Sequence, residues 1–263
     1  MPAEATTTTR TDGAAARARA IAWRRGQHAG LCDVIEPWER GTAVRCTRLP
    51  TFWNYNSLRV EGPDTGVGAD ALVRAADILQ GDLQHRQIEI EDEAAGERLR
   101  PGFVALGWAT ERLAWMLLEG PPPAGPDYDE VPFAATAPLR VEWSRSAPWS
   151  PDEQAAELFS GHEDSVAALR GTRALLARDA DGAPAGFVCF GTQGDAAEVE
   201  QVYVSPAHRD RGIGGGLVAA AARTAAGTAT FIIADDEGDS KRLYARLGFE
   251  PVWMQHVFTR RPG

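Results

Sequence analysis

The hydrophobic and polar residues in the second half of the chain follow patterns that predict a succession of strands and helices. Short apolar runs predict strands, and the turn signal Ala180-Asp181-Gly182 joins two of them in a hairpin. A longer run with an early proline and acids in its first turn predicts a helix. The expected strands are residues 139–143, 172–178, 185–190, 197–204, 228–234 and 252–259, and the expected helices are residues 151–169, 213–226 and 240–247. Their order, β-α-β-β-β-α-β-α-β, predicts a mixed α/β fold.

A proline-rich run divides the chain of 263 residues. It begins at Gly120-Pro-Pro-Pro-Ala-Gly-Pro126 and continues to Pro138. Stacked prolines remove backbone donors and stiffen the chain, so we expect a linker at residues 120–137. This gives an N-terminal extension at residues 1–29, one domain at 30–119 and a second at 138–263. In the extension we expect disorder at residues 1–12 and a helix at residues 14–25, with no secretory signal.

A glycine-rich turn separates the predicted strand at 197–204 from the predicted helix at 213–226. It contains Arg209-Asp-Arg-Gly212-Ile-Gly214, preceded by Val204-Ser-Pro206. Unpaired amides at the positive end of a helix bind an anion, most often a phosphate, and side chains in place of the glycines would keep a phosphate away from the backbone. The dinucleotide fingerprint fails because Leu217 replaces its third glycine, and the nucleotide P-loop fails because the chain's only lysine is Lys241.

The pattern Arg-x-x-Gly-x-Gly after Val-x-Pro resembles the acetyl-CoA pyrophosphate loop of the GNAT N-acetyltransferase superfamily. A second signature, Ser240-Lys-Arg-Leu-Tyr-Ala-Arg-Leu-Gly-Phe249, is similar to the late helix motif of that family. The resemblance implies a mixed, mostly antiparallel sheet flanked by helices. The predicted order of elements matches the family except for one helix fewer near the front.

The same resemblance implies a set of site residues on and after the strand at 197–204. Glu198 occupies the position of the family's general base, and Glu200 is the rival because both face one side of a regular strand. A bulge is expected here, with the backbone of Val202, Tyr203 and Val204 lining the cofactor and one amide polarising the thioester. The expected proton donor to the thiolate is Tyr244. The other expected cofactor contacts are Arg209, Asp210, Arg211, Gly212, Ile213, Gly214, Gly215 and Ser240.

One departure from the family lies ahead of Tyr244. Glu237 stands where many members have asparagine, and Ser240 replaces the common alanine. The acidic run Asp235-Asp-Glu-Gly-Asp239 either recruits a cationic substrate or is a solvated loop. The solvated loop is the favoured interpretation.

The first half of the chain carries a faint copy of both signatures. Arg59-Val-Glu-Gly-Pro63-Asp-Thr-Gly66-Val-Gly68 parallels the glycine-rich turn, and Phe103-Val-Ala-Leu-Gly-Trp108 parallels Tyr244-Ala-Arg-Leu-Gly-Phe249. The copied turn is shorter and lacks an arginine, and Phe103 replaces the tyrosine. We therefore expect a degenerate GNAT-like domain in tandem with a catalytic one.

The composition of the chain limits the classes of partner that it can bind. The net charge of −10 argues against nucleic acid or an anionic membrane and is compatible with a cationic amine. No apolar run approaches the ~20 residues of a membrane span. Three cysteines favour a reducing cytoplasm.

His162, His208 and His256 lack metal-ligand spacing, so no metal is expected. Ser160 and Cys189 have no partner suggesting a nucleophile, and residues 53–56 favour a structural corner over a substrate pocket.

The sequence thus predicts an enzyme that transfers an acetyl group from acetyl-CoA to a primary amine by direct attack in a ternary complex. The acceptor is a small-molecule amine or a protein N-terminus. Two alternatives stay open: a non-catalytic acyl-CoA-binding regulatory protein, and transfer of another acyl group.

Overall fold

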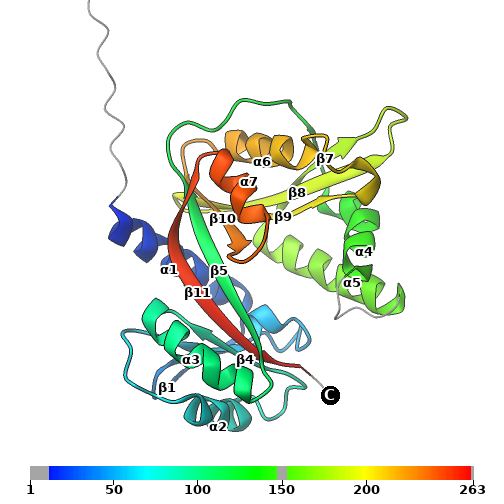
Figure 1. The fold of residues 1–263 in the computed structure, drawn as a ribbon. Coiled ribbons are helices and arrows are strands. Elements are labelled where there is room, and N and C mark those ends of the chain that lie inside the picture. The colour runs from blue at the N-terminus through cyan, green and yellow to red at the C-terminus, as the bar shows by residue number, and fades with distance from the viewer. Residues whose placement is uncertain (1–11, 147–152, 262–263) are drawn as a thin grey trace, which may run out of the picture.

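The computed structural model describes residues 12–146 and 153–261, which form a three-layer α/β structure (Figure 1). The helices are α1 Gly13–Leu31, α2 Ala69–Leu79, α3 Glu93–Ala105, α4 Ala137–Arg145, α5 Glu153–Arg170, α6 Ile213–Thr224 and α7 Ser240–Arg246, with 3₁₀ turns η1 Trp53–Tyr55, η2 Phe133–Thr136 and η3 Pro206–His208. The strands are β1 Val34–Trp38, β2 Gly41–Arg45, β3 Ser57–Val60, β4 Arg86–Ile90, β5 Ala109–Leu118, β6 Asp129–Val131, β7 Arg173–Arg178, β8 Pro184–Gln193, β9 Ala196–Val204, β10 Ala229–Asp235 and β11 Phe249–Arg260. Within these residues no helix is both long enough and apolar enough to cross a bilayer.

All described strands belong to one sheet in the order β1-β2-β3-β4-β11-β5-β10-β9-β8-β7-β6. Only the pairs β3–β4 and β9–β10 are parallel, so the sheet is mixed and mostly antiparallel, as expected. At its centre each half of the chain inserts its last strand into the other half. β11 lies between β4 and β5, and β5 lies between β11 and β10. Figure 1 shows these two long strands running side by side from one half to the other.

Helices cover both faces of the sheet. Side chains of α6 and α7 pack on one face with Ala114 and Met116 of β5, and α2 and α3 pack on the same face in the first half. On the other face α1 covers the central strands, where Trp23 packs with Trp115 and Trp253. The second half is closed on that face by α4, and α5 bridges to the first half through Val166.

The two halves repeat the same arrangement of elements. In each, a parallel strand pair flanks a helix, α2 or α6, that follows a glycine with positive φ, Gly66 at 73° or Gly212 at 77°. In each, a later helix ends before a second such glycine, Gly107 at 75° or Gly248 at 91°, and the chain enters the exchanged strand. The repeat inferred from sequence therefore extends to the backbone, because left-handed φ at these turns favours glycine.

The start of the second half differs from the sequence-based expectation. Residues 139–143, expected as a strand, lie in helix α4, so that expectation is wrong. The pattern misled because Arg140 alternates with apolar neighbours yet is itself fully buried, paired with Glu163 and Asp164. The stretch 120–137 holds strand β6, which pairs with β7, and turn η2. The second half thus begins with strand β6 followed by the two helices α4 and α5. The helix that the expected order lacked near the front, compared with the family, is therefore present.

Helix α1 begins one residue before the expected helix and extends to Leu31. Of the stretch 1–12 expected to be disordered, residues 1–11 lie outside the described residues, and Asp12 caps the helix by accepting from the amide of Ala14.

Helix α1 docks through a buried polar layer as well as through tryptophan. Arg24 forms an ion pair with Glu89 at 2.6 Å, and Glu89 also accepts from Ser57 at 2.9 Å and Gln255 at 2.8 Å. These partners keep Glu89 charged, and the pKa of Glu89 falls to about 2 although burial opposes it.

Candidate active site

Strand β9 carries the expected bulge. Two of its residues, Gln201 and Val202, lie opposite the single residue Val188 of β8, and Gln201 has a φ of 50°. On the other edge of β9, pairing with β10 ends at Val199, although both strands continue. Backbone groups of β9 beyond the bulge therefore have no strand partner on that side. The two strands open a wedge that can receive an extended ligand with polar groups.

The bulge also decides which side chains share a face of β9. Glu198 and Glu200 precede it and face the same side, where Arg170 of α5 contacts both carboxylates at 3.5 and 2.9 Å. Gln201 faces that side as well, because the bulge breaks the alternation of the strand. Val202 instead packs against the core beneath α6. Tyr203 packs against Trp143 of α4, so its side chain points away from α6.

The turn after β9 leaves backbone amides unpaired at the start of α6. Gly212 is the N-cap residue of this helix, and the preceding Asp210 has a φ of 60°. The first amide to bond inside the helix is that of Gly216, which donates to the carbonyl of Gly212 at 3.0 Å. The amides of residues 213–215 find no backbone acceptor among the described residues. They lie at the positive end of the helix, where an anion is stabilised.

The glycines of this turn are required by the structure to different degrees. Gly212 needs its positive φ, and a Cβ on Gly216 would come within 2.5 Å of the Tyr128 hydroxyl. A Cβ on Gly214 or Gly215 would meet its nearest side chain at 3.6 or 3.5 Å, an ordinary contact. The fold itself therefore requires the first and last of these glycines.

The two arginines of the turn are not equivalent. The Nε of Arg209 donates to the carbonyl of Val204 at 3.1 Å, and its guanidinium lies 5.9 Å from the centre of the Tyr203 ring. Arg211 is exposed and forms no ion pair with any described residue. Arg209 thus shapes the turn, whereas Arg211 is available to an incoming anion.

Comparison with known families agrees with this geometry. Residues 136–249 match the model of the Acetyltransferase (GNAT) family. The match covers less than half of the chain, and the matched residues are called the GNAT domain below. The matched region holds β9, the turn and helices α6 and α7, which are the elements that carry the two sequence signatures.

Relatives of the chain extend the comparison. A mycothiol acetyltransferase from Segniliparus rotundus is 43% identical over 84 residues, and the match covers 31% of this chain and 31% of that protein. The chain therefore spans about a third of the length of the curated relative it matches. A conserved protein of unknown function from Staphylococcus epidermidis shares the fold over 88% of this chain and 95% of its own, with a TM-score of 0.69 and 17% identity. A GCN5-related N-acetyltransferase from Sphaerobacter thermophilus shares it over 74% of this chain and 68% of its own, with a TM-score of 0.51 and 18% identity.

In the GNAT domain Tyr244 lies on α7 with its ring in the core that α6 and α7 share with the sheet. Its side chain is buried, and its hydroxyl has no hydrogen-bond partner among the described residues. Burial raises the pKa of Tyr244 to about 12, so the hydroxyl carries its proton at neutral pH. A protonated, uncommitted hydroxyl can serve as a proton donor.

Glu198 is held by the N-terminal helix. It accepts a hydrogen bond from Trp23 Nε1 at 2.8 Å and another from Gln27, both on α1, and Arg170 lies beyond. Its carboxylate is buried, and burial together with the neighbouring Glu200 raises the pKa of Glu198 while Arg170 and Trp23 oppose the rise. Because these donors surround its carboxylate, Glu198 holds α1 in place and is not open to a substrate.

Removing one of these donors should loosen α1. We expect Trp23→Phe, which keeps an aromatic ring but deletes the N–H, to lower the free energy of unfolding by about 1.5–3 kcal/mol, because a buried carboxylate loses a partner. Urea unfolding followed by circular dichroism measures this change. Arg19→Ala on the same helix removes a half-exposed ion pair with Asp195 at 3.0 Å and should cost less than about 1 kcal/mol. Equal effects of the two substitutions would contradict the assignment.

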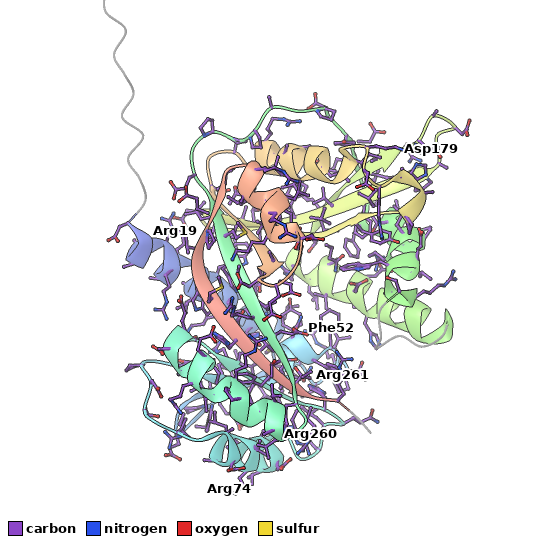
Figure 2. The ribbon with its side chains drawn as sticks, in the orientation of Figure 1. Arg19, Phe52, Arg74, Asp179, Arg260 and Arg261 are labelled. Atoms are coloured by element: carbon purple, nitrogen blue, oxygen red, sulfur yellow. The ribbon has the colours of Figure 1, made fainter. Side chains whose placement is uncertain are left out.

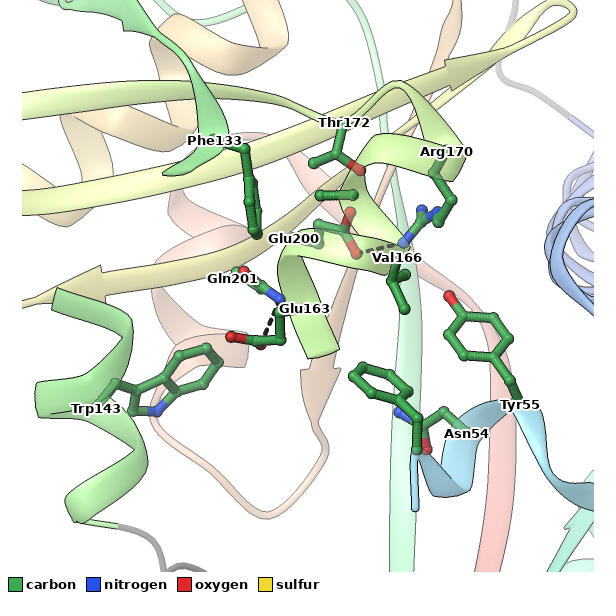
Figure 3. A pocket seen from close by; sticks show the side chains of 12 residues that line it. Asn54, Tyr55, Phe133, Trp143, Glu163, Val166, Arg170, Thr172, Glu200 and Gln201 are labelled. Carbon is green, nitrogen blue, oxygen red and sulfur yellow. Dashed lines mark hydrogen bonds and ion pairs between the residues drawn. The ribbon is translucent and has the colours of Figure 1, made fainter. Parts of the chain in front are cut away.

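Glu200 lines a cavity of about 240 Å³ between the two halves of the chain (Figure 3). One wall comes from the first half, with Asn54 and Tyr55 of η1, and the opposite wall comes from Phe133, Trp143 and α5. Figure 2 places Phe52, another lining residue, at this junction. Within the cavity Glu200 pairs with Arg170 at 2.9 Å. The segment 53–56 is thus partly a structural corner, with Asn56 buried, and partly a cavity wall.

A second carboxylate in this cavity, Glu163 of α5, is not among the residues that the sequence indicated. It is 3% exposed, and its two oxygens accept from Gln201 Nε2 at 2.8 Å and from Arg140 Nη1 at 3.1 Å. Burial raises the pKa of Glu163 to about 7, although Arg140 opposes the rise. No sequence motif surrounds Glu163. The only available signal was a carboxylate on a predicted helix near the strand at 197–204.

Three of the four acids in the run at 235–239 form ion pairs, with arginines of the first half of the chain and with basic residues of α7. Glu237 pairs with Arg100 of α3 at 2.6 Å, and Asp236 pairs with Arg112 of β5 and with Lys241. The run therefore braces the β10–α7 turn against the first half. Ser240, the first residue of α7, is half-buried and has no side-chain hydrogen bond to a described residue.

The remaining candidates do not gather into a second centre. No group of three or more metal-binding side chains occurs within the described residues. His162 lies 3.3 Å from Thr51, His208 lies 3.8 Å from Asp179, and His256 is buried beside α3. Cys32, Cys46 and Cys189 are buried and unpaired, and the side chain of Ser160 lies outside the described residues.

Proposed function

We propose that this protein is an acetyl-CoA-dependent N-acetyltransferase that acetylates a primary amine by direct attack in a ternary complex. The observation that carries the proposal is the wedge between β9 and β10. It leads to unpaired amides at residues 213–215 at the start of α6, and β9 lines a cavity on its α5 face. A phosphate-bearing acyl donor and an acceptor can therefore meet along one strand.

The cofactor would lie along β9. The amides of residues 213–215 and the exposed Arg211 suit the diphosphate, because both supply donors and positive potential. The unpaired backbone of residues 202–204 can bond the amide groups of the pantetheine arm, and one N–H there can polarise the thioester carbonyl. By the sequence resemblance, Ser240 and residues 209–210 would also border this path.

The acceptor would enter the cavity. Its walls combine aromatic rings with the carboxylates Glu163 and Glu200, a combination that suits a cationic amine with an apolar portion. A protein N-terminus carries the same ammonium chemistry. The first half of the chain supplies one wall through η1, so it takes part in shaping the acceptor site.

Direct transfer requires a base and an acid. An alkylammonium must lose a proton before its nitrogen attacks the thioester, and the departing thiolate must gain one. Tyr244 is the proton donor, since it is buried, protonated and without a described hydrogen-bond partner. Of the two strand glutamates, Glu200 is the better placed, because it lines the cavity whereas Glu198 is committed to α1.

We further propose that the first half of the chain, residues 30–119, is a degenerate copy that does not catalyse. Its parallel strands β3 and β4 stay bonded to their ends, and the amide of Glu91 still donates to the carbonyl of Val60 at 3.1 Å. In its glycine turn the carboxylate of Asp64 accepts from the amide of Gly66 at 2.8 Å and pairs with Arg98. An acidic side chain thus occupies the turn that would meet a phosphate.

Titration calorimetry with acetyl-CoA and an assay of thiol release with a panel of amines test the proposal. We expect micromolar binding, weakened about tenfold or more by Arg211→Ala, and thiol release that depends on the amine. Binding without release for any amine would favour a non-catalytic acyl-CoA-binding protein, and release from a different acyl-CoA would favour another acyl group. Absence of binding to any acyl-CoA would overturn the proposal.

A further inference from the structure

The cavity between the halves contains a carboxylate, Glu163, that lies outside the strand expected to supply the base. We propose that Glu163 accepts the proton of the incoming amine, so that the base comes from α5 rather than from β9. This inference rests on the proposed N-acetyl transfer. It changes the roles of Glu198 and Glu200: both position Arg170, and Glu200 also lines the cavity.

The geometry ties Glu163 to the point where β9 opens. Its Oε1 accepts from the side chain of Gln201, the residue with positive φ in the bulge (Figure 3). Gln201 lies beyond Val199, in the part of β9 that no longer pairs with β10. A nitrogen that reaches Glu163 therefore lies close to the part of the strand that would hold the thioester.

The surroundings of the three carboxylates differ in a way that favours Glu163. Glu198 accepts from Trp23 and Gln27 of α1 and does not line the cavity. Glu200 lines the cavity but forms a 2.9 Å ion pair with Arg170. Glu163 lines the cavity, is buried, accepts a hydrogen bond from Gln201 of the bulge, and forms a longer ion pair, 3.1 Å to Arg140.

The charged groups that face Glu163 come from three elements: Arg140 of α4, Asp164 of α5 itself, and Glu200 of β9, with Arg170 beyond it. Arg140 favours the ionised form, whereas burial, Glu200 and Asp164 favour the neutral form. With a pKa of about 7, Glu163 can both take up and release a proton at neutral pH. General-base catalysis is most effective when the pKa of the base is near the working pH.

The proton balance of the transfer closes with these residues. The ammonium nitrogen gives one proton to Glu163 and attacks the thioester carbon, forming the C–N bond. The C–S bond then breaks, and the sulfur receives a proton from Tyr244. The nitrogen loses its second proton, which replaces the one that Tyr244 gave, and Glu163 releases its proton to solvent. The net products are an amide, a thiol and one proton.

The pH dependence of kcat/KM with an amine that the wild-type protein acetylates tests the inference. We expect a rise of activity with pH through a midpoint near 7, because Glu163 must be ionised to act. Glu163→Gln should lower kcat/KM by about 10²-fold and remove that rise. An acceptor whose own pKa is lowered by electron-withdrawing substituents is already neutral and should restore much of the loss. Glu163→Asp keeps a carboxylate and should retain a pH-dependent rise at reduced rate.

Asp164→Asn is the matched control, because Asp164 also contacts Arg140 but does not line the cavity. Because Asp164 favours the neutral form of Glu163, this substitution should move the midpoint of the rise to lower pH, and it should change kcat/KM above that midpoint by less than about threefold. The inference is overturned if Glu163→Gln keeps both its rate and its pH dependence, or if Glu200→Gln alone removes the rise near pH 7. Should Glu163→Gln fail to fold, wild-type activity in Glu163→Asp with an unshifted profile overturns it equally. A wild-type protein that releases no thiol with any amine would instead contradict the proposed function.

Discussion

Residues 120–263 expressed alone are expected not to fold, although they contain the whole GNAT domain. In the intact chain β10 pairs with β5 from Phe231 to Asp235, and β11 pairs with β5 along most of its length. The truncated chain would lose this central strand, together with Ala114 and Met116 of the core beneath α6 and α7. It would also lose α1 and with it Trp23. Losing a central strand and a buried helix far exceeds the 5–15 kcal/mol that stabilises a typical domain.

Solubility, circular dichroism and gel filtration of residues 120–263 measure this outcome. Two controls separate the loss of β5 from damage at the cut. Co-expression with residues 1–119 should restore a folded complex, because the exchanged strands can pair between the fragments. A protease site inserted between Gly120 and Pro126, cut after folding, should leave the two fragments associated. A monomeric, cooperatively unfolding fragment 120–263 that binds acetyl-CoA would refute the prediction.

The second large effect is expected at Tyr244. Tyr244→Phe should lower kcat by about 10²–10⁴-fold while leaving the affinity for acetyl-CoA nearly unchanged. The substitution removes only a hydroxyl that bonds to no described residue, so the ring should keep its packing against Phe249, 6.4 Å away. Stopped-flow thiol release gives kcat, and calorimetry gives the affinity.

Tyr128→Phe provides the comparison for this experiment. Tyr128 also packs against the core of the second half, and burial also raises its pKa, but it lies within the proline-rich run and not on α7. Loss of the Tyr128 hydroxyl should leave kcat within about twofold of the wild-type value. Full turnover in Tyr244→Phe would remove Tyr244 from the mechanism, and equal losses in both variants would point to a packing effect instead.

Much of the second half was predictable because its signals are local. The hairpin of β7 and β8 is set by a turn, α6 by the turn at Gly212, and the entry to β11 by Gly248, each a short-range preference of the backbone. The faint repeat in the first half could be recognised for the same reason, since Gly66 and Gly107 have positive φ values like those of Gly212 and Gly248. The bulge followed only from the family resemblance.

What failed to emerge from sequence depends on contacts between distant residues. Helix α4 resembled a strand because its pattern treats Arg140 as exposed, whereas Glu163, 23 positions later, allows it to be buried. The strand exchange leaves no mark in sequence, because β5 and β11 have the same character whichever half they join. The cavity position of Glu163 and the hydrogen bonds that hold Glu198 could not be predicted for the same reason. Trp23, for example, contacts Glu198 across 175 residues of sequence.

The crossed arrangement of the central strands also constrains how the chain is made. During synthesis β4 and β5 leave the ribosome long before β11, which ends at Arg260. Until then both strands present open edges, which other chains can pair with. Neither half can finish folding first, so folding of both halves waits until β11 has been made. A cell that makes this protein quickly would therefore need chaperones to shield those early edges.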